Sequence, residues 1–74
     1  MDKQAFFAAV IEILEGDPSA AVSGDAQIRE LGNWDSLAVI SFVAMVDSEL
    51  GQIVDPEKLK SARTLDDLAG LVGL

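Results

Sequence analysis

The chain has 74 residues, 50% of them hydrophobic, and a formal net charge of −8 at pH 7. This length predicts a single domain spanning residues 1–74, and the hydrophobic content excludes a disordered chain. The chain holds no cysteine, histidine or tyrosine. Disulfides, thiol catalysis and the commonest general base are therefore excluded, and we expect no enzyme activity.

The charge balance indicates which partners the chain avoids. Thirteen acidic residues outnumber five basic ones, so the chain repels nucleic acids and anionic membranes and favours electropositive partners. Its apolar runs are shorter than a membrane span, and its N-terminal residues lack the pattern of a signal peptide. We expect a cytoplasmic protein, monomeric by default, that binds neither nucleic acid nor a membrane.

The first predicted element is an amphipathic helix over residues 2–15. Asp2 is a suitable N-cap, and Gly16-Asp17-Pro18 ends the helix. Hydrophobic residues recur at helical spacing and should face the core: Phe6, Phe7, Val10, Ile11, Ile13 and Leu14.

A long connection is predicted over residues 16–35. Its turn signals are Asp17-Pro18-Ser19 and Ser23-Gly24-Asp25. Connections of this length in a small domain are usually functional or held by their own apolar residues. The candidate anchors are Ile28, Leu31 and Trp34.

Three further helices complete the prediction. One begins at Asp35-Ser36 and runs to about residue 50, where Gly51 ends it. A short one follows the Asp55 cap and Pro56, to about residue 59. The last, residues 64–72, begins with a Thr64–Asp67 capping box. Together these elements predict an all-α fold, a small four-helix bundle with three longer helices and one short helix.

Ser36 is the residue whose role matters most. A serine beside an aspartate at a helix start is usually only a cap. The same position lies at the positive end of a helix, where a phosphate is stabilised. Because no base stands beside Ser36 in the sequence and the chain lacks histidine, this hydroxyl is a poor nucleophile. It is suited to modification by another enzyme.

The stretch Leu31-Gly32-Asn33-Trp34-Asp35-Ser36-Leu37 resembles the phosphopantetheine attachment motif of acyl carrier and peptidyl carrier proteins. The order of the helices agrees with this family over nearly the whole chain. The resemblance implies that a phosphopantetheinyl transferase, with Mg²⁺, moves 4'-phosphopantetheine from coenzyme A to Ser36, with Asp35 assisting. It also implies that the thiol of this arm carries an acyl or aminoacyl group as a thioester between loading and transferring enzymes.

The predicted helix over residues 36–50 has two faces. Val39, Phe42, Val43, Val46 and Leu50 form one stripe, which should face the core. The opposite face carries Leu37, Ile40, Ser41, Ala44, Asp47 and Ser48. In the family that the chain resembles, partner enzymes dock on this outer face. We call Leu37, Ile40 and Ala44 the outer ridge, and expect partners to recognise it more than charge; the alternative is that these residues pack beneath the long connection.

In fatty-acid carriers of the family that the chain resembles, this outer face is typically acidic. The outer face of this chain differs. Ala38, Ser41 and Ser48 stand where acids are expected. This departure argues against primary fatty acid biosynthesis and favours a carrier in specialised or secondary metabolism.

Two smaller features have competing interpretations. The bases Lys58, Lys60 and Arg63 either form a solvated face, which we favour, or contact the arm's phosphate or an acidic partner. Trp34 either anchors the long connection, which we favour, or lines the exit of the arm.

The alternative to a covalent carrier is a non-covalent, acidic helical module that binds a partner through the outer ridge. The two hypotheses differ at Ser36: replacing it with alanine abolishes the function of a carrier and spares that of a module.

Overall fold

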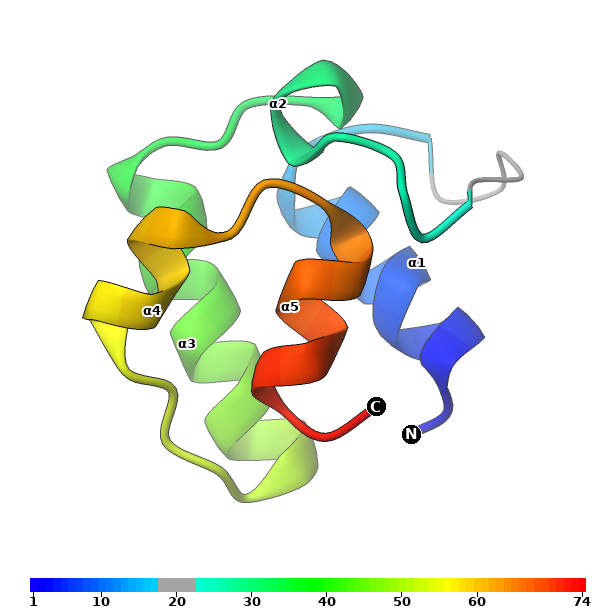
Figure 1. Ribbon diagram of the computed structural model, residues 1–74. Helices are drawn as coiled ribbons and strands as arrows, with labels where there is room; N and C mark the ends of the chain where they lie inside the picture. The colour runs from blue at the N-terminus through cyan, green and yellow to red at the C-terminus, as the bar shows by residue number, and fades with distance from the viewer. Residues whose placement is uncertain (18–22) are drawn as a thin grey trace.

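A computed structural model describes residues 1–17 and 23–74 of the chain. In these residues the fold is all-helical, and its one extended feature is an isolated antiparallel bridge between Gln27 and Thr64. The helices of this part of the chain are α1 (Lys3–Ile13), α2 (Ile28–Leu31), α3 (Ser36–Leu50), α4 (Pro56–Ser61) and α5 (Leu65–Leu71) (Figure 1). The predicted all-α class is confirmed, with one more short helix than expected. None of the helices in the described part of the chain is long and apolar enough to cross a membrane.

Helix α1 begins as predicted and ends earlier. The Asp2 side chain accepts a hydrogen bond from the backbone N–H of Ala5 at 2.7 Å. The helix ends at Ile13 rather than Glu15, because Glu15 adopts a left-handed backbone with φ of 63°. Pro18, part of the predicted stop and of the first turn signal, lies outside the described residues.

The long connection was predicted to lack regular structure, and this was wrong at α2. Ile28 is 1% exposed, and its N–H donates to the Arg63 carbonyl at 2.8 Å. The Leu65 N–H likewise donates to the Ala26 carbonyl at 3.2 Å. These bonds tie the connection to the segment between α4 and α5, so a four-residue helix forms without a side-chain cap.

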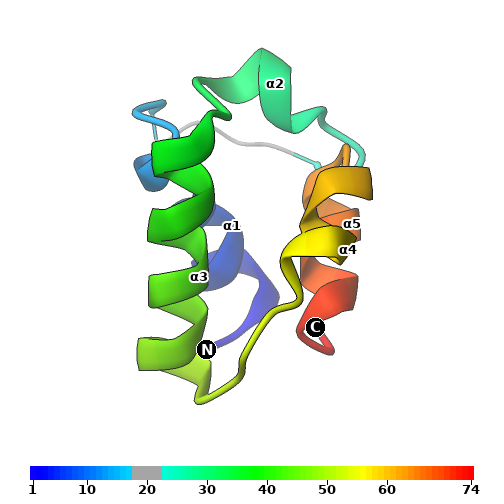
Figure 2. The ribbon, with the colours of Figure 1, turned by 90° about the vertical axis from the view of Figure 1, so that its left-hand side faces the viewer.

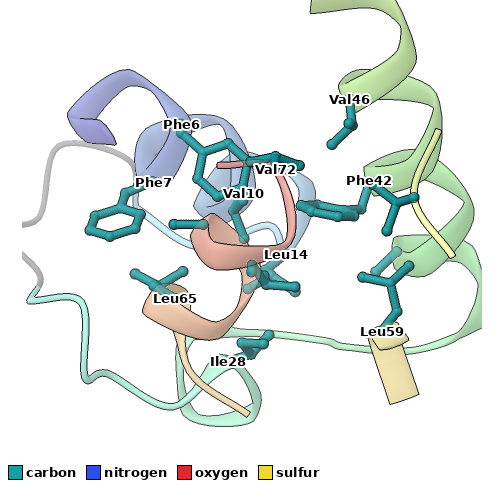
Figure 3. Packing of buried hydrophobic residues seen from close by; sticks show 14 residues of the cluster. Phe6, Phe7, Val10, Leu14, Ile28, Phe42, Val46, Leu59, Leu65 and Val72 are labelled. Carbon is teal, nitrogen blue, oxygen red and sulfur yellow. The ribbon is translucent and has the colours of Figure 1, made fainter. Parts of the chain in front are cut away.

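The helices enclose a core that α1, α3 and α5 share. Helix α1 contacts both α3 and α5, and α2 lies across one end of the bundle (Figures 1 and 2). Phe6 and Phe42 meet edge to face with ring centroids 5.9 Å apart. Figure 3 shows their side chains among Val10, Leu59 and Val72. The predicted core residues of α1 are buried, except for Ile13, which is half-buried and packs against the core.

The predicted stripe of α3 faces the core. Phe42 and Val46 are fully buried, while Val39, Val43 and Leu50 are half-buried and pack against the core. One placement was wrong: Ala38, expected on the outer face, is only 5% exposed. Ala38 lies four residues before Phe42 and so falls on the same face of the helix.

The predicted helix signals after α3 are confirmed. Gly51 ends α3 in the left-handed region, with φ of 63°. Asp55 caps α4 by accepting from the Glu57 N–H at 2.9 Å, and α4 continues to Ser61. Thr64 and Asp67 form the capping box of α5, each side chain accepting from the other's backbone N–H at 3.1 Å.

Candidate functional site

The candidate site is the N-terminal end of α3. Asp35 is the N-cap: its backbone is extended, and its carboxylate accepts a hydrogen bond from the Ala38 N–H at 2.9 Å. Ser36 is the first residue of the helix and is exposed. Its hydroxyl forms no hydrogen bond with any residue that the structure describes. Asp35 therefore caps the helix, and the Ser36 hydroxyl remains available.

This helix end also offers backbone donors. The N–H groups of Ser36 and Leu37 donate to no acceptor within the described residues. The first N–H groups of a helix have no intrahelical partner, and the helix dipole adds partial positive charge there. The Asp35 carboxylate at the same end repels a second anion, but solvent and salt screen exposed charges. The helix end can thus stabilise a phosphate bonded to Ser36.

The segment before Ser36 is held in place by packing. Trp34 is half-buried and meets Phe42 edge to face, with ring centroids 6.1 Å apart. The Asn33 N–H donates to the Leu14 carbonyl at 3.2 Å. A Cβ at Gly32 would collide with the backbone of Leu14, so only glycine allows this close approach. Trp34 thus anchors the connection, as favoured, and fixes where α3 begins.

A shallow cavity of about 160 Å³ lies beside this helix start. It is lined by Asn33, Asp35, Leu37, Ala38 and Ser41, together with Ile13 and Glu15 of the α1 end. The lining offers carboxylate, amide and hydroxyl groups but no cation and no imidazole. Its proton-accepting side chains are therefore the carboxylates of Glu15 and Asp35.

The outer ridge is solvent-exposed. Leu37 is 72% and Ile40 65% exposed, and Ala44 is also exposed. The alternative that Leu37 and Ile40 pack beneath the long connection is wrong for the described residues. Asp47 and Ser48 are exposed farther along α3, whereas Ser41 is half-buried at the cavity.

The predicted residues that lie away from the start of α3 include two lysines of α4. Lys58 is exposed, and Lys60 forms an exposed ion pair with Glu57 at 3.3 Å. Sequence reasoning missed Ile53, which is 92% exposed in the segment between α3 and α4. Its neighbour Val54 is buried. Because successive residues of an extended segment face opposite sides, a core role for Val54 would have indicated that Ile53 faces solvent.

The helical fold and the exposed serine at the start of the longest helix are what a small carrier domain requires. Residues 4–72 match the family model described as the phosphopantetheine attachment site. The chain belongs to this family, as its resemblance to acyl carrier proteins predicted, and the group that the family binds is 4'-phosphopantetheine. Domains of this family are carriers and not catalysts. No curated protein and no solved structure matches the chain.

The residues at the start of α3 fit this prosthetic group. The group needs an accessible hydroxyl for its phosphodiester, and Ser36 is exposed and unbonded within the described chain. The unpaired N–H groups of the first turn favour the negative phosphate. The group supplies a terminal thiol, which the chain itself lacks because it has no cysteine.

Proposed function

We propose that this protein is an acyl carrier protein in which Ser36 bears the 4'-phosphopantetheine arm and residues 1–74 form a single carrier domain. One observation carries the proposal: the Ser36 hydroxyl is exposed at the helix start, while Asp35 alone caps the helix. Family membership supplies the group, and this geometry supports Ser36 as the residue that bears it.

The chain's own residues position the attachment point and do not react with the cargo. Asp35, through its bond to the Ala38 N–H, caps the first turn of α3, on which Ser36 lies. The N-terminal end of α3 stabilises the phosphodiester. With no cysteine or histidine in the chain, neither a thiolate nor an imidazole of the carrier attacks a thioester. The carrier thus protects an acyl or aminoacyl group that its partners load and remove.

The outer ridge is the proposed docking surface for these partners, which are a phosphopantetheinyl transferase and the acyl- or aminoacyl-loading and transferring enzymes. Leu37 and Ile40 are exposed apolar side chains within the first turns after Ser36. Burying apolar surface contributes about 25 cal/mol per Å², whereas an exposed ion pair contributes about 0–1 kcal/mol. Ser41 and Asp47 extend the surface on either side of the ridge.

We further propose a cytoplasmic carrier in specialised metabolism. The support is the composition of the outer face, where Ser41 and Ser48 stand in place of acids. Ala38 no longer contributes to this argument, because it is buried.

The experiment is enzymatic loading followed by intact-mass measurement. The purified protein is incubated with coenzyme A, Mg²⁺ and a broad-specificity phosphopantetheinyl transferase. We expect one mass gain of a single phosphopantetheine, no gain for Ser36→Ala, and full gain for Ser48→Ala, a matched exposed serine on the same helix. Loading of Ser36→Ala would overturn the assignment.

The exposure of Leu37 and Ile40 also supports the second candidate, a non-covalent interaction module. It predicts that Ser36→Ala retains partner binding and biological function, while Ile40→Asp loses both. A covalent carrier loses function in Ser36→Ala although the fold is intact.

A further inference from the structure

A second cavity lies between α2 and the segment that joins α4 to α5. It shares no lining residue with the cavity beside Ser36. It has a volume of about 260 Å³ and is lined by Gln27, Ile28, Arg29, Lys60, Ala62 and Arg63. Its lining holds three cationic side chains and no carboxylate. In a chain with five basic residues and a net charge of −8, this concentration of positive charge is unexpected.

The charges of the three cations are only weakly compensated, and the charge of Arg63 is the smallest contribution to the lowered pKa of Asp67. Arg29 and Arg63 form no ion pair with any residue in the described ranges. Lys60 pairs with Glu57 at 3.3 Å, but both side chains are more than 70% exposed, so this pair is weak. Glu30 follows Arg29 directly in α2 and forms no ion pair within the described residues. The Asp67 carboxylate accepts hydrogen bonds from the backbone N–H groups of Arg63 and Thr64. That carboxylate serves the cap of α5.

Backbone hydrogen bonds place Arg29 and Arg63 on neighbouring segments that line one cavity. The Ile28 N–H donates to the Arg63 carbonyl at 2.8 Å, and Gln27 and Thr64 form an antiparallel bridge. Arg29 follows Ile28 directly, so its position relative to Arg63 is fixed by hydrogen bonds and by the buried Ile28 side chain. Like charges held close repel one another. An anion between them removes this repulsion and gains charge-assisted hydrogen bonds.

From this geometry we propose that the cavity binds a small oxyanion, a carboxylate or a phosphate group. Guanidinium groups match such groups with paired N–H donors. The cavity is large enough for one group of this size. Arg29, Lys60 and Arg63 bind the anion, and Gln27 adds an amide donor.

The oxyanion has two possible sources. One is a free anion. The other is an acid group at the far end of the cargo, and this source depends on the function proposed above. The cavity is lined in part by Ile28 and Arg29 of α2. Helix α2 lies across the end of the bundle at which α3 begins (Figures 1 and 2).

The site itself is tested on the unmodified protein with inorganic phosphate. Phosphate is titrated at constant ionic strength while amide chemical shifts are recorded. We expect saturable shifts at residues 27–29 and 62–64. Arg29→Gln and Arg63→Gln should each weaken binding by about threefold to tenfold, the loss of one solvent-exposed hydrogen-bonded contact.

The matched control is Lys58→Gln, which removes the same charge from α4 at a residue that does not line the cavity. It should leave phosphate affinity within about twofold, because an exposed charge outside the site acts only through a screened field. Non-saturable shifts, or an equal loss of affinity in Lys58→Gln and Arg63→Gln, would overturn the proposal. Because this titration needs no arm, its failure is independent of the role of Ser36.

The source is distinguished on the loaded protein. Succinyl and butyryl groups have the same chain length, and only succinyl ends in a carboxylate. If the cargo is the source, the succinyl form shifts the cavity amides and loses the shift in Arg63→Gln, while the butyryl form does not shift them. Equal spectra for the two forms, together with saturable phosphate binding, assign the site to a free anion.

Discussion

The carboxylate of Asp35 accepts a hydrogen bond from the backbone N–H of Ala38 at 2.9 Å, and this bond separates two roles at the start of α3. Asp35 satisfies the helix end, so Ser36 has no structural task there. The two residues should therefore respond differently to substitution.

Asp35→Ala should lower the free energy of unfolding by about 0.5–2 kcal/mol, the usual cost of losing an N-cap. Ser36→Ala should change it by less than about 0.5 kcal/mol, as for an exposed residue without a partner. Urea denaturation followed by circular dichroism measures both. If Ser36→Ala costs as much as Asp35→Ala, then the serine is part of the cap and its availability is not established.

Phe42 is the central contact between the core and the segment before Ser36, because it packs against both Phe6 and Trp34. Phe42→Ala should cost about 3–5 kcal/mol. The free energy of unfolding of a domain of this size is roughly 3–5 kcal/mol, so circular dichroism should show a largely unfolded variant. The control is Ile53→Ala at the 92% exposed position, which should retain wild-type stability. A folded Phe42→Ala variant of undiminished stability would show that the core is not organised as described.

Asp67 gives stability a dependence on pH. The backbone N–H groups of Arg63 and Thr64 hold the pKa of its carboxyl below the usual 3.8, and the charge of Arg63 contributes least. A lowered pKa in the folded state contributes stability above pH 3.8 that is lost as the pH falls through the folded-state value.

Asp67→Asn should therefore be less stable than the wild type at neutral pH, and the difference should narrow as the pH falls below about 3.8. Denaturant unfolding of both proteins at several pH values measures this. A difference that stays constant over the whole range would mean that the carboxylate charge has no part in capping α5.

The outer ridge can be tested with the transferase itself. Ile40→Asp should lower kcat/KM for modification of Ser36 by about tenfold or more, since burying an Ile side chain contributes about 1.5–3 kcal/mol. Ser48→Asp adds the same charge to the same helix away from the ridge and should have little effect. Raising the salt concentration should also have less effect than Ile40→Asp. Strong salt sensitivity with a tolerant Ile40→Asp variant would show that charge governs recognition.

The sequence predicted those parts of the fold that depend on local signals. The caps at Asp2, Asp55 and Thr64 each place a side-chain acceptor at a helix start, and all three were predicted correctly. The start of α3 at Asp35-Ser36 was also predicted, but the cap considered there was Ser36, whereas Asp35 is the N-cap. Such caps involve residues within one turn of each other, so they can be read from spacing alone.

The sequence did not predict what depends on contacts between distant segments. Helix α2 forms because Ile28 and Ala26 form backbone hydrogen bonds with Arg63 and Leu65, which lie more than thirty residues away along the chain. The cluster of Lys58, Lys60 and Arg63 seemed local in the sequence. In the structure Lys60 and Arg63 line the cavity together with Arg29, whereas Lys58 does not line it. The exposure of Leu37 and Ile40 could not be predicted either, because it depends on whether the long connection covers these side chains.

The most direct test of the central claim is the intact mass of the protein after incubation with coenzyme A, Mg²⁺ and the transferase. The account predicts a single phosphopantetheine on the wild type and on Ser48→Ala, and none on Ser36→Ala with its fold intact. A folded wild-type protein that no transferase modifies, or a Ser36→Ala variant that is still modified, would contradict it.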